Sequence, residues 1–563
     1  MKPYWWQETN IYQIYPRSFL DTNGDGIGDI PGIIRKLDYL QRLGVETLWL
    51  SPVNRSPMAD NGYDISDYYA IDPVFGTNAD MERLIEEARK RNIRIVMDLV
   101  VNHCSDQHEW FQKALKDPEG PYGDYFFIRK GVNGKEPNNW RSFFEGRSAW
   151  ERIPGTEYYY LHLFAKKQPD LNWDNPKLRE EIYGAVNYWL EKGVAGFRLD
   201  SITYLKKEPG LPSYPPDGED GLVSVKHGTR CRPGLESFLT ELRDRTYGRE
   251  ALTVGETSGI ARDRLPDFIG LENGFFSMVF DFSITTLDFV EPNCYWFEKR
   301  EWDPDELKER LFATHEADGE ECWHATMLEC HDSPRAVSYY LPPEGRNFRG
   351  ASMLAVMSLC RRGTPVLYQG QELGMTNTAF PEIGQYNDIS SLGQYRTALE
   401  HGCDPAYALK RIQERSRDNG RYPFSWDASE KAGFTEGTPW LPVADNRDRI
   451  NAEKELADRD SLFYVYQKLL SLRKEGSCRR TLIEGKLVPY LPEQHHLLAY
   501  FRCMEETHET GALLILCNYQ GEKQKVELPE GSFAVVYDNM KKSGTVSGSL
   551  MLDGFEAAIL RRE

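Results

Sequence analysis

The sequence predicts an α/β protein built on a closed (β/α)8 TIM barrel, and two observations carry this prediction. Short runs rich in β-branched residues alternate with helical patterns along most of the chain, an order that favours a parallel sheet or barrel. Several runs end in acids or a histidine, as in GFRLDSI (196–202) and RIVMDLVVNH (94–103). In such barrels the C-terminal ends of the strands meet on one face, so these polar groups indicate one shared site.

Eight strand-like runs make up the predicted barrel. They are 11–19, 47–53, 94–101, 196–202, 252–256, 276–282, 326–330 and 364–368. Helical patterns separate most of them, for example 80–92 and 175–193. Asp80 and Asn175 are the expected N-caps of these two helices, and Gly193 is an expected C-cap.

Two regions depart from the alternation and predict further domains. Residues 104–173 are irregular and rich in aromatic rings, which indicates a subdomain inserted after the third strand. Residues 481–563 hold short strand-like runs between turns, a pattern typical of an antiparallel β-sandwich. The predicted catalytic barrel therefore comprises 1–103 and 174–480, with the insertion at 104–173 and the sandwich at 481–563.

Composition narrows the range of partners. The 563 residues carry a net charge of -19, which argues against nucleic acid and against an anionic membrane surface. No run is apolar enough to cross a bilayer, and the N-terminus MKPYWWQETN lacks the apolar core of a signal peptide. The ten cysteines include no CxxC pair, so free thiols are expected. We expect a cytoplasmic monomer without an organic cofactor.

Three acids stand out because each ends a strand-like run. Asp200 closes GFRLD, Glu256 closes LTVGE and Asp332 closes TMLECHD. Arg198 precedes Asp200 by two residues, on the same face of its strand, where it can keep a carboxylate ionised. A single acid after a strand is commonly a helix cap or a solvated charge. Three that converge on one pocket give the geometry that glycosidic-bond cleavage requires.

These segments carry a resemblance to a known family. DLVVNH, GFRLDSI, VGET and HDSPR, in this order and spacing, resemble the signature blocks of the α-amylase family of glycoside hydrolases. QPDLNW (168–173), DNGYDISDY (60–68) and YQGQELGMTN (368–377) resemble its oligo-1,6-glucosidase and α-glucosidase branch. The resemblance implies a barrel, an insertion after strand 3 and a C-terminal β domain, which is the outline obtained above from the residues.

The resemblance also implies roles for residues at matching positions. Asp200 is expected to be the nucleophile, Glu256 the general acid/base and Asp332 the stabiliser of the transition state. A retaining enzyme needs its two reacting carboxyl groups about 5 Å apart. The residues expected to contact the substrate are Asp60, Tyr63, His103, Phe144, Phe164, Gln168, Arg198, His331 and Arg417. For the rings of Phe144 and Phe164, plain core packing is an equal alternative.

A separate motif, DTNGDGIGD (21–29), predicts a metal loop. Oxygen donors alternate along it as in the first part of an EF-hand, and Gly26 permits the sharp turn. The expected ligands of a structural Ca²⁺, or alternatively Mg²⁺, are Asp21, Asn23, Asp25, the Ile27 carbonyl and Asp29. The twelfth position is Gly32, so the bidentate glutamate of an EF-hand is missing and a metal-free turn is the alternative.

The resemblance implies a retaining, exo-acting α-glucosidase that cleaves α-1,6 or α-1,4 bonds of short glucosides such as isomaltose and maltose. Ser201 follows the expected nucleophile where α-1,6-cleaving members commonly have valine and α-1,4-cleaving members threonine or alanine, so the linkage stays open. Cys330 and the segment 225–234 also depart from the pattern. Three alternatives remain: a transglycosylating isomerase of sucrose or maltose, a trehalose-6-phosphate hydrolase, and a non-catalytic relative.

Overall fold

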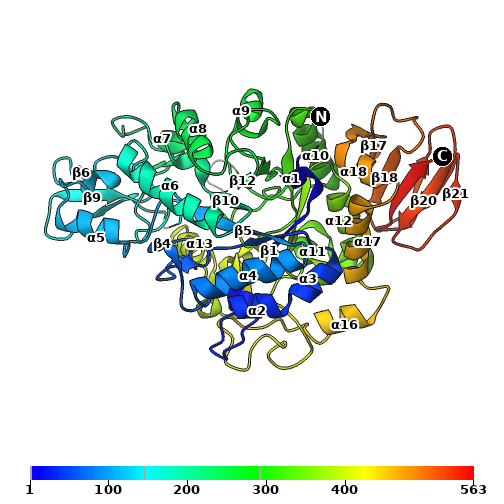
Figure 1. The fold of residues 1–563 in the computed structure, drawn as a ribbon, viewed down its shortest axis with the longest axis horizontal. Coiled ribbons are helices and arrows are strands. Elements are labelled where there is room, and N and C mark those ends of the chain that lie inside the picture. Colours follow the sequence, from blue (N-terminus) through cyan, green and yellow to red (C-terminus); the bar gives the residue numbers. More distant parts are fainter. Residues whose placement is uncertain (1–2, 145, 291–294) are drawn as a thin grey trace.

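The computed structural model describes residues 3–144, 146–290 and 295–563, and its centre is a closed eight-stranded parallel barrel (Figure 1). Around the barrel each strand pairs with its neighbours in the order β1-β15-β14-β13-β12-β10-β5-β2. The strands are β1 (Ile11–Ile14), β2 (Thr47–Leu50), β5 (Arg94–Val100), β10 (Gly196–Asp200), β12 (Leu252–Gly255), β13 (Met278–Phe280), β14 (His324–Thr326) and β15 (Thr364–Tyr368). The predicted barrel is confirmed.

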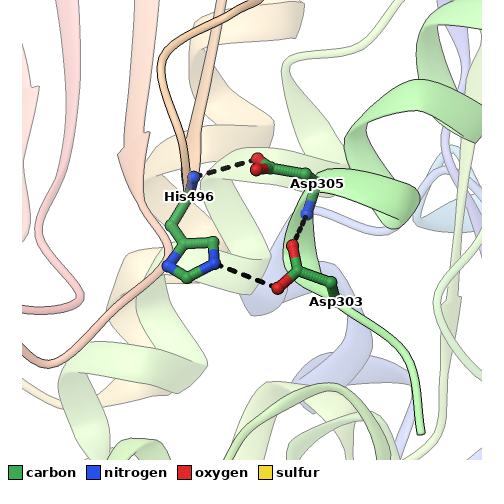
Figure 2. Close-up of side chains that lie close together, drawn as sticks. All are labelled: Asp303, Asp305 and His496. Carbon is green, nitrogen blue, oxygen red and sulfur yellow. Dashed lines mark hydrogen bonds and ion pairs between the residues drawn. The ribbon is translucent and has the colours of Figure 1, made fainter.

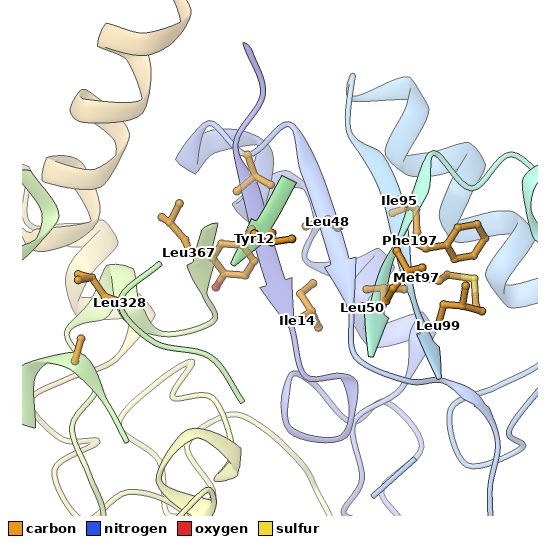
Figure 3. Close-up of a cluster of buried hydrophobic side chains, with 14 of the residues drawn as sticks. Tyr12, Ile14, Leu48, Leu50, Ile95, Met97, Leu99, Phe197, Leu328 and Leu367 are labelled. Carbon is orange, nitrogen blue, oxygen red and sulfur yellow. The ribbon is translucent and has the colours of Figure 1, made fainter. Parts of the chain in front are cut away.

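Side chains alternate between the two faces of the barrel wall, because successive residues of a strand point to opposite sides. One set packs outward in a large apolar cluster that includes Tyr12, Leu48, Met97 and Phe197 (Figure 3). The other set points into the barrel. Trp49, Val96, Val254 and Phe280 are among its members. The strands are therefore buried on both faces, as parallel strands require.

The register of β5 against β10 sets up the site. Arg198 lies opposite Asp98, and Asp200 lies opposite Val100. Arg198 and Asp200 share the inward face of β10 because they are two residues apart. On the other side β10 pairs with β12, where Leu199 lies opposite Gly255, one residue before Glu256. The pairing therefore delivers Arg198, Asp200 and Glu256 to the same end of the barrel.

The seventh predicted strand was placed too late in the sequence. Its ladder runs from His324 to Thr326, and the predicted run 326–330 shares only Thr326 with it. Beyond the ladder Met327, Leu328 and Cys330 are buried, so the run is apolar without being paired. Met327 and Cys330 belong to the apolar cluster inside the barrel and Leu328 to the larger outer cluster, so their pattern resembles that of a strand.

The helices around the barrel begin at side-chain caps. In α6 (Pro176–Glu191) Asn175 accepts hydrogen bonds from the first turn, as predicted, and Gly193 follows the C-cap in a left-handed conformation. In α4 (Asn78–Lys90) the prediction was wrong, because Thr77 is the N-cap and Asp80 closes a capping box with it. A Thr-x-x-Asp segment offers both residues as caps, and the box uses them together. The helix α2 (Ile30–Arg35) is capped by Asp29.

Residues 104–173 carry α5 (Glu109–Lys116) and a small antiparallel sheet. Its strands are β6 (Ile128–Lys130), β9 (Tyr158–Leu161) and β8 (Trp150–Arg152), in that order. A short strand, β7 (Trp140–Arg141), pairs instead with β11 (Val223–Ser224) from the loop after β10. Rings from both segments pack in one cluster, so the insertion is fastened to the loop that follows Asp200.

The C-terminal region is an antiparallel β structure beside the barrel (Figure 1). Its six-stranded sheet contains β16 (Lys486–Pro489), β17 (Leu497–Cys503), β18 (Leu513–Asn518), β23 (Ala557–Arg562), β20 (Phe533–Asp538) and β21 (Thr545–Val546), in that order. A second pair, β19 (Gln524–Glu527) and β22 (Ser549–Leu552), covers one face through a shared apolar cluster. The helix α18 (Arg479–Glu484) runs across residue 481, so the strands begin a few residues after the predicted boundary.

Two further sequence predictions concern the whole chain. Nine of the ten cysteines carry free thiols, and Cys294 lies outside the described residues. Within the described ranges, no helix is both long and apolar enough to cross a bilayer.

Candidate active site

A cavity opens at the C-terminal end of the barrel strands. It encloses about 600 Å³, open solvent at its mouth included, which is within the range of small-molecule sites. The three predicted acids line it together with eight other residues. These are Asp60, Tyr63, His103, Phe144, Phe164, Gln168, Ser201 and Arg417. Segments more than 350 residues apart in the sequence thus meet around one hollow.

One guanidinium joins two of the three acids. The Arg198 Nη1 atom lies 2.9 Å from Asp200 Oδ1, and its Nη2 atom lies 2.9 Å from Glu256 Oε2. Glu256 Oε2 also accepts the backbone N–H of Ser201, which has a left-handed φ of 48°. Because the two carboxylates bind neighbouring nitrogens of one rigid guanidinium, Arg198 holds them side by side.

The same residues set the proton affinities of the two acids. Burial raises the pKa of Glu256 to about 7, against the attraction of Arg198. Burial also raises the pKa of Asp200, to about 6, and again Arg198 opposes the rise. Two carboxyl groups with different proton affinities in one pocket are the arrangement that acid–base catalysis needs.

The third acid, Asp332, is held on another side of the pocket. Its Oδ1 atom lies 2.6 Å from Arg421 Nη2 and 3.3 Å from Arg417 Nη1, and its Oδ2 atom lies 3.1 Å from His331 Nε2. Burial disfavours the charge, but these three residues outweigh it and keep the pKa of Asp332 well below its usual range. Asp332 is therefore a fixed negative charge, with 31% of its side chain exposed to the cavity.

His331 belongs to a polar chain behind the acids. Burial lowers its pKa, so the ring is neutral. Gln13 Nε2 donates to Nδ1 at 2.8 Å, which leaves the proton on Nε2, 2.6 Å from the Tyr63 hydroxyl oxygen and 3.1 Å from Asp332 Oδ2. The ring also stacks on Tyr63 with centroids 5.3 Å apart. His331 and Tyr63 are thus oriented by neighbours on several strands.

An ion pair lies in the wall of the cavity. Arg417 Nη2 lies 3.2 Å from Asp60 Oδ1, and Gln168 Nε2 donates to Asp60 Oδ2 at 3.2 Å. His103 stands beside them, with its Nε2 atom 3.0 Å from the Tyr63 carbonyl oxygen. Burial lowers the pKa of His103 to about 4, so this ring is neutral too. The pair joins two distant segments of the chain in the wall of the cavity.

The two rings for which packing was an equal alternative both line the cavity. Phe144 lies under the Arg417 guanidinium at 5.0 Å, and its ring centroid is 5.3 Å from that of Phe164. Phe164 in turn is 5.0 Å from His103. The inserted segment therefore contributes apolar rings to the cavity wall beside Arg417 and His103, and such rings suit the C–H face of a sugar.

Sequence reasoning missed three charged residues of this network. Asp98 on β5 binds Arg198 at 2.8 Å and accepts a hydrogen bond from the Tyr63 hydroxyl at 3.0 Å. Asp388 accepts from Arg417 Nε at 2.7 Å, and Arg421 binds Asp332. Asp98 carried a usable signal, since a lone acid inside an apolar strand is costly to bury without a partner.

The predicted metal loop has the donor chemistry of a hard cation site. Gly26 has a φ of 89°, and a Cβ there would lie 1.8 Å from the Thr438 carbonyl oxygen, so only glycine fits. Asp21 accepts N–H groups of residues 23, 24 and 26 and the hydroxyl of Thr435. Burial opposes its charge, but these bonds lower the pKa of Asp21 overall. The loop thus joins the segment after β1 to residues 435–438.

A second group of possible ligands lies elsewhere. Within the described residues, Asp303, Asp305 and His496 are the group of three acids or histidines whose ligand atoms lie close enough for one ion (Figure 2). The Lys308 ammonium already lies 2.8 Å from Asp305, and His496 bonds Asp303 at 3.1 Å. These contacts fasten α10 (Pro304–Asp318) to the C-terminal domain and account for the cluster without a metal.

Known proteins resemble the chain over most of its length. Residues 13–481 match the family described as alpha amylase, catalytic domain. An oligo-1,6-glucosidase of Halalkalibacterium halodurans is 43% identical over 530 residues, 94% of this chain and 93% of that protein. A trehalose-6-phosphate hydrolase of Bacillus subtilis is 39% identical over 99% of this chain and 96% of its own. The crystal structure of an isomaltulose synthase from Klebsiella sp. LX3 superposes with a TM-score of 0.93, at 36% identity and full coverage of both chains.

Proposed function

The chain belongs to the α-amylase family of catalytic domains, and from this premise we propose that it is a retaining, exo-acting α-glucosidase. It hydrolyses α-1,6 or α-1,4 bonds of short oligosaccharides from their non-reducing ends. The observation that carries the proposal is the pairing of Asp200 and Glu256 through Arg198 in a pocket whose wall also holds the Asp60–Arg417 ion pair. We infer that this ion pair closes one end of the pocket, which then admits one terminal sugar, whereas an open cleft would admit the middle of a chain.

In the proposed mechanism Asp200 attacks the anomeric carbon while Glu256 protonates the leaving oxygen. The pKa of Asp200, about 6, is below that of Glu256, about 7, so the first acid ionises before the second. Water then attacks the glucosyl–enzyme ester, and Glu256 takes its proton. Asp332 stays negative throughout and stabilises the positive charge that develops on the sugar ring.

The pH dependence of kcat/KM follows from these two groups. Activity requires ionised Asp200, so the rate falls as the pH drops below about 6. It also requires protonated Glu256, so the rate falls as the pH rises above about 7. We therefore expect a narrow bell with its maximum between these values, measured on an uncharged aryl α-glucoside. A plateau that extends well into the alkaline range would contradict the role of Glu256.

Asp98 is predicted to position and tune Asp200. Its negative charge raises the pKa of Asp200, and it competes for the same Arg198 nitrogen. Replacing Asp98 by Asn keeps the shape and removes the charge, so the acid limb of the bell should move to lower pH. A purely structural role would lower the rate at every pH and leave the limb in place.

The preferred substrate is decided by comparing four sugars. Initial rates and products should be measured with isomaltose, maltose, sucrose and trehalose 6-phosphate. Fast release of glucose from isomaltose or maltose supports the proposal and settles how Ser201, which lines the pocket, affects linkage. An isomeric disaccharide as the main product from sucrose would favour the isomerase alternative. If trehalose 6-phosphate were the one sugar hydrolysed, this would favour the alternative of a trehalose-6-phosphate hydrolase.

We also propose that the loop 21–29 holds a structural Ca²⁺, or Mg²⁺ in its place, through Asp21, Asn23, Asp25, the Ile27 carbonyl and Asp29. Chelation should lower the unfolding temperature by a few degrees, and added Ca²⁺ should restore it by mass action. Replacing the exposed Asp25 by Asn keeps its turn and removes one charge, so the calcium response should weaken. Identical unfolding curves with chelator and with Ca²⁺ would contradict a metal site.

A further inference from the structure

A second, buried cavity lies between the barrel and the C-terminal domain, away from the active site. Its wall combines residues of α10, of β14, of the turn after α12 (Phe348–Leu359) and of β17. The polar residues that line it are Asp281, Thr314, His315, Asp318, His324, Thr326, Arg361, Arg362 and Tyr500. The narrow interior has room for about one water-sized particle.

Hydrogen-bond donors in this wall lack partners. Arg361 is 6% exposed, and its Nη1 atom lies 3.0 Å from Asp281. Its Nε and Nη2 atoms, which form the side-on edge of the guanidinium, have no hydrogen-bond partner within the described ranges. Within the described ranges the hydroxyls of Thr326 and Tyr500 also lack a hydrogen-bond partner. These two residues are 3% and 1% exposed. Leaving such groups unbonded is costly, so an acceptor is needed.

Charge in the wall also favours an anion. Arg361 and Arg362 line the cavity as cations, and Asp281 and Asp318 line it as carboxylates. Burial opposes a charge on His324, which also lines the cavity, but Asp318 raises the pKa of this ring overall. His324 pairs with Asp318 at 2.5 Å and Arg361 with Asp281. Arg362 instead donates to the Cys322 and Glu320 carbonyl oxygens, and among the residues that the structure describes it forms no ion pair with a carboxylate.

Two more arginines lie behind this wall. Arg473 and Arg502 are 3% and 0% exposed, and the hydrogen bonds that they make go to backbone carbonyl oxygens. The charge of Arg502 acts on the cavity: burial, then Arg362 and Arg502, lower the pKa of the lining His315 to about 3, so this ring carries no charge. The region is therefore short of negative charge.

We propose that this cavity is a binding site for a small monovalent anion, with chloride as the physiological class of ligand. The side-on edge of Arg361 and the hydroxyls of Thr326 and Tyr500 donate to it. A water molecule accepts two hydrogen bonds at most, whereas a halide accepts from all of these donors and also balances the charge of Arg362. Since Thr326 belongs to the barrel and Tyr500 to β17, the bound ion joins the two domains.

The first test measures the unfolding temperature of the whole protein at constant ionic strength while sodium chloride replaces sodium methanesulfonate. A specific site predicts a rise that saturates with chloride concentration, because the ion binds the folded state. Equal unfolding temperatures in the two salts would overturn the proposal and leave water as the occupant.

Variants then locate the effect. Tyr500→Phe and Thr326→Val each remove one donor without removing the buried charges, and each should weaken chloride binding about tenfold. The absolute stability of these variants is not the readout, since deleting an unbonded hydroxyl can itself stabilise the fold. Tyr490→Phe is the matched control, because its hydroxyl bonds the Glu527 carbonyl oxygen at the surface of the same domain. An unchanged chloride response in both cavity variants would refute the assignment.

Crystals grown with bromide in place of chloride give an independent answer. The proposal predicts an anomalous peak inside the cavity beside Arg361, and its loss in Tyr500→Phe at a low bromide concentration. A cavity without anomalous signal at saturating bromide would show that it holds water only.

Discussion

Replacing Asp200 by Asn is expected to lower kcat on isomaltose by at least about 10³-fold, because the amide cannot form the glucosyl ester. The change is nearly isosteric, and the amide oxygen can still accept from Arg198, so the fold should stay intact. KM should change far less than kcat. Initial rates of glucose release, with unfolding temperature as the check on folding, measure the effect.

A matched control guards against a general effect of removing a carboxylate. Asp174 is about half exposed and pairs with Lys206 outside the pocket, so Asp174→Asn should leave kcat near the wild-type value. A fully active Asp200→Asn enzyme would refute the assignment of the nucleophile and with it the retaining mechanism.

Replacing Glu256 by Gln is expected to lower kcat/KM on isomaltose by about 10²- to 10⁴-fold, the usual contribution of a general acid. The loss should depend on the leaving group. An acidic phenol leaves as the phenolate without being protonated. Formation of the glucosyl–enzyme from such a glucoside should therefore be almost unaffected. The measurement compares the burst of released 2,4-dinitrophenol from its α-glucoside in the wild type and the variant.

The two acid variants should therefore behave differently, which separates their roles. Asp200→Asn should be inactive on both substrates, because both need the nucleophile. Glu256→Gln should retain the burst but lose most of its steady-state turnover, since the same residue serves as base when water attacks the glucosyl–enzyme. Equal losses on the two substrates would mean that Glu256 does not protonate the leaving group.

Local pattern predicted most of the fold and of the site. Strand-like runs separated by helical patterns were sufficient for the barrel, because each strand is buried on both faces and reads as an apolar run. The acids were found because each stands at the end of such an apolar run, where a charged side chain is conspicuous. All the residues predicted to contact substrate lie in or directly behind one cavity.

The parts that could not be predicted depend on contacts between distant segments. Asp388 and Arg421 pair with Arg417 and Asp332 across loops whose positions only the folded chain defines. The run 326–330 was assigned to a strand because its apolar residues beyond Thr326 are buried in the two apolar clusters of the barrel without belonging to the ladder. At Thr77 and Asp80 two good caps compete, and only the capping box shows which begins the helix.

The most direct test of the central claim is the anomeric form of the glucose first released from an aryl α-glucoside, followed by proton NMR before mutarotation. The account predicts α-glucose first, because attack by Asp200 and then by water inverts the anomeric carbon twice. Release of β-glucose first would mean a single inversion by water, and it would contradict the roles assigned to Asp200 and Glu256.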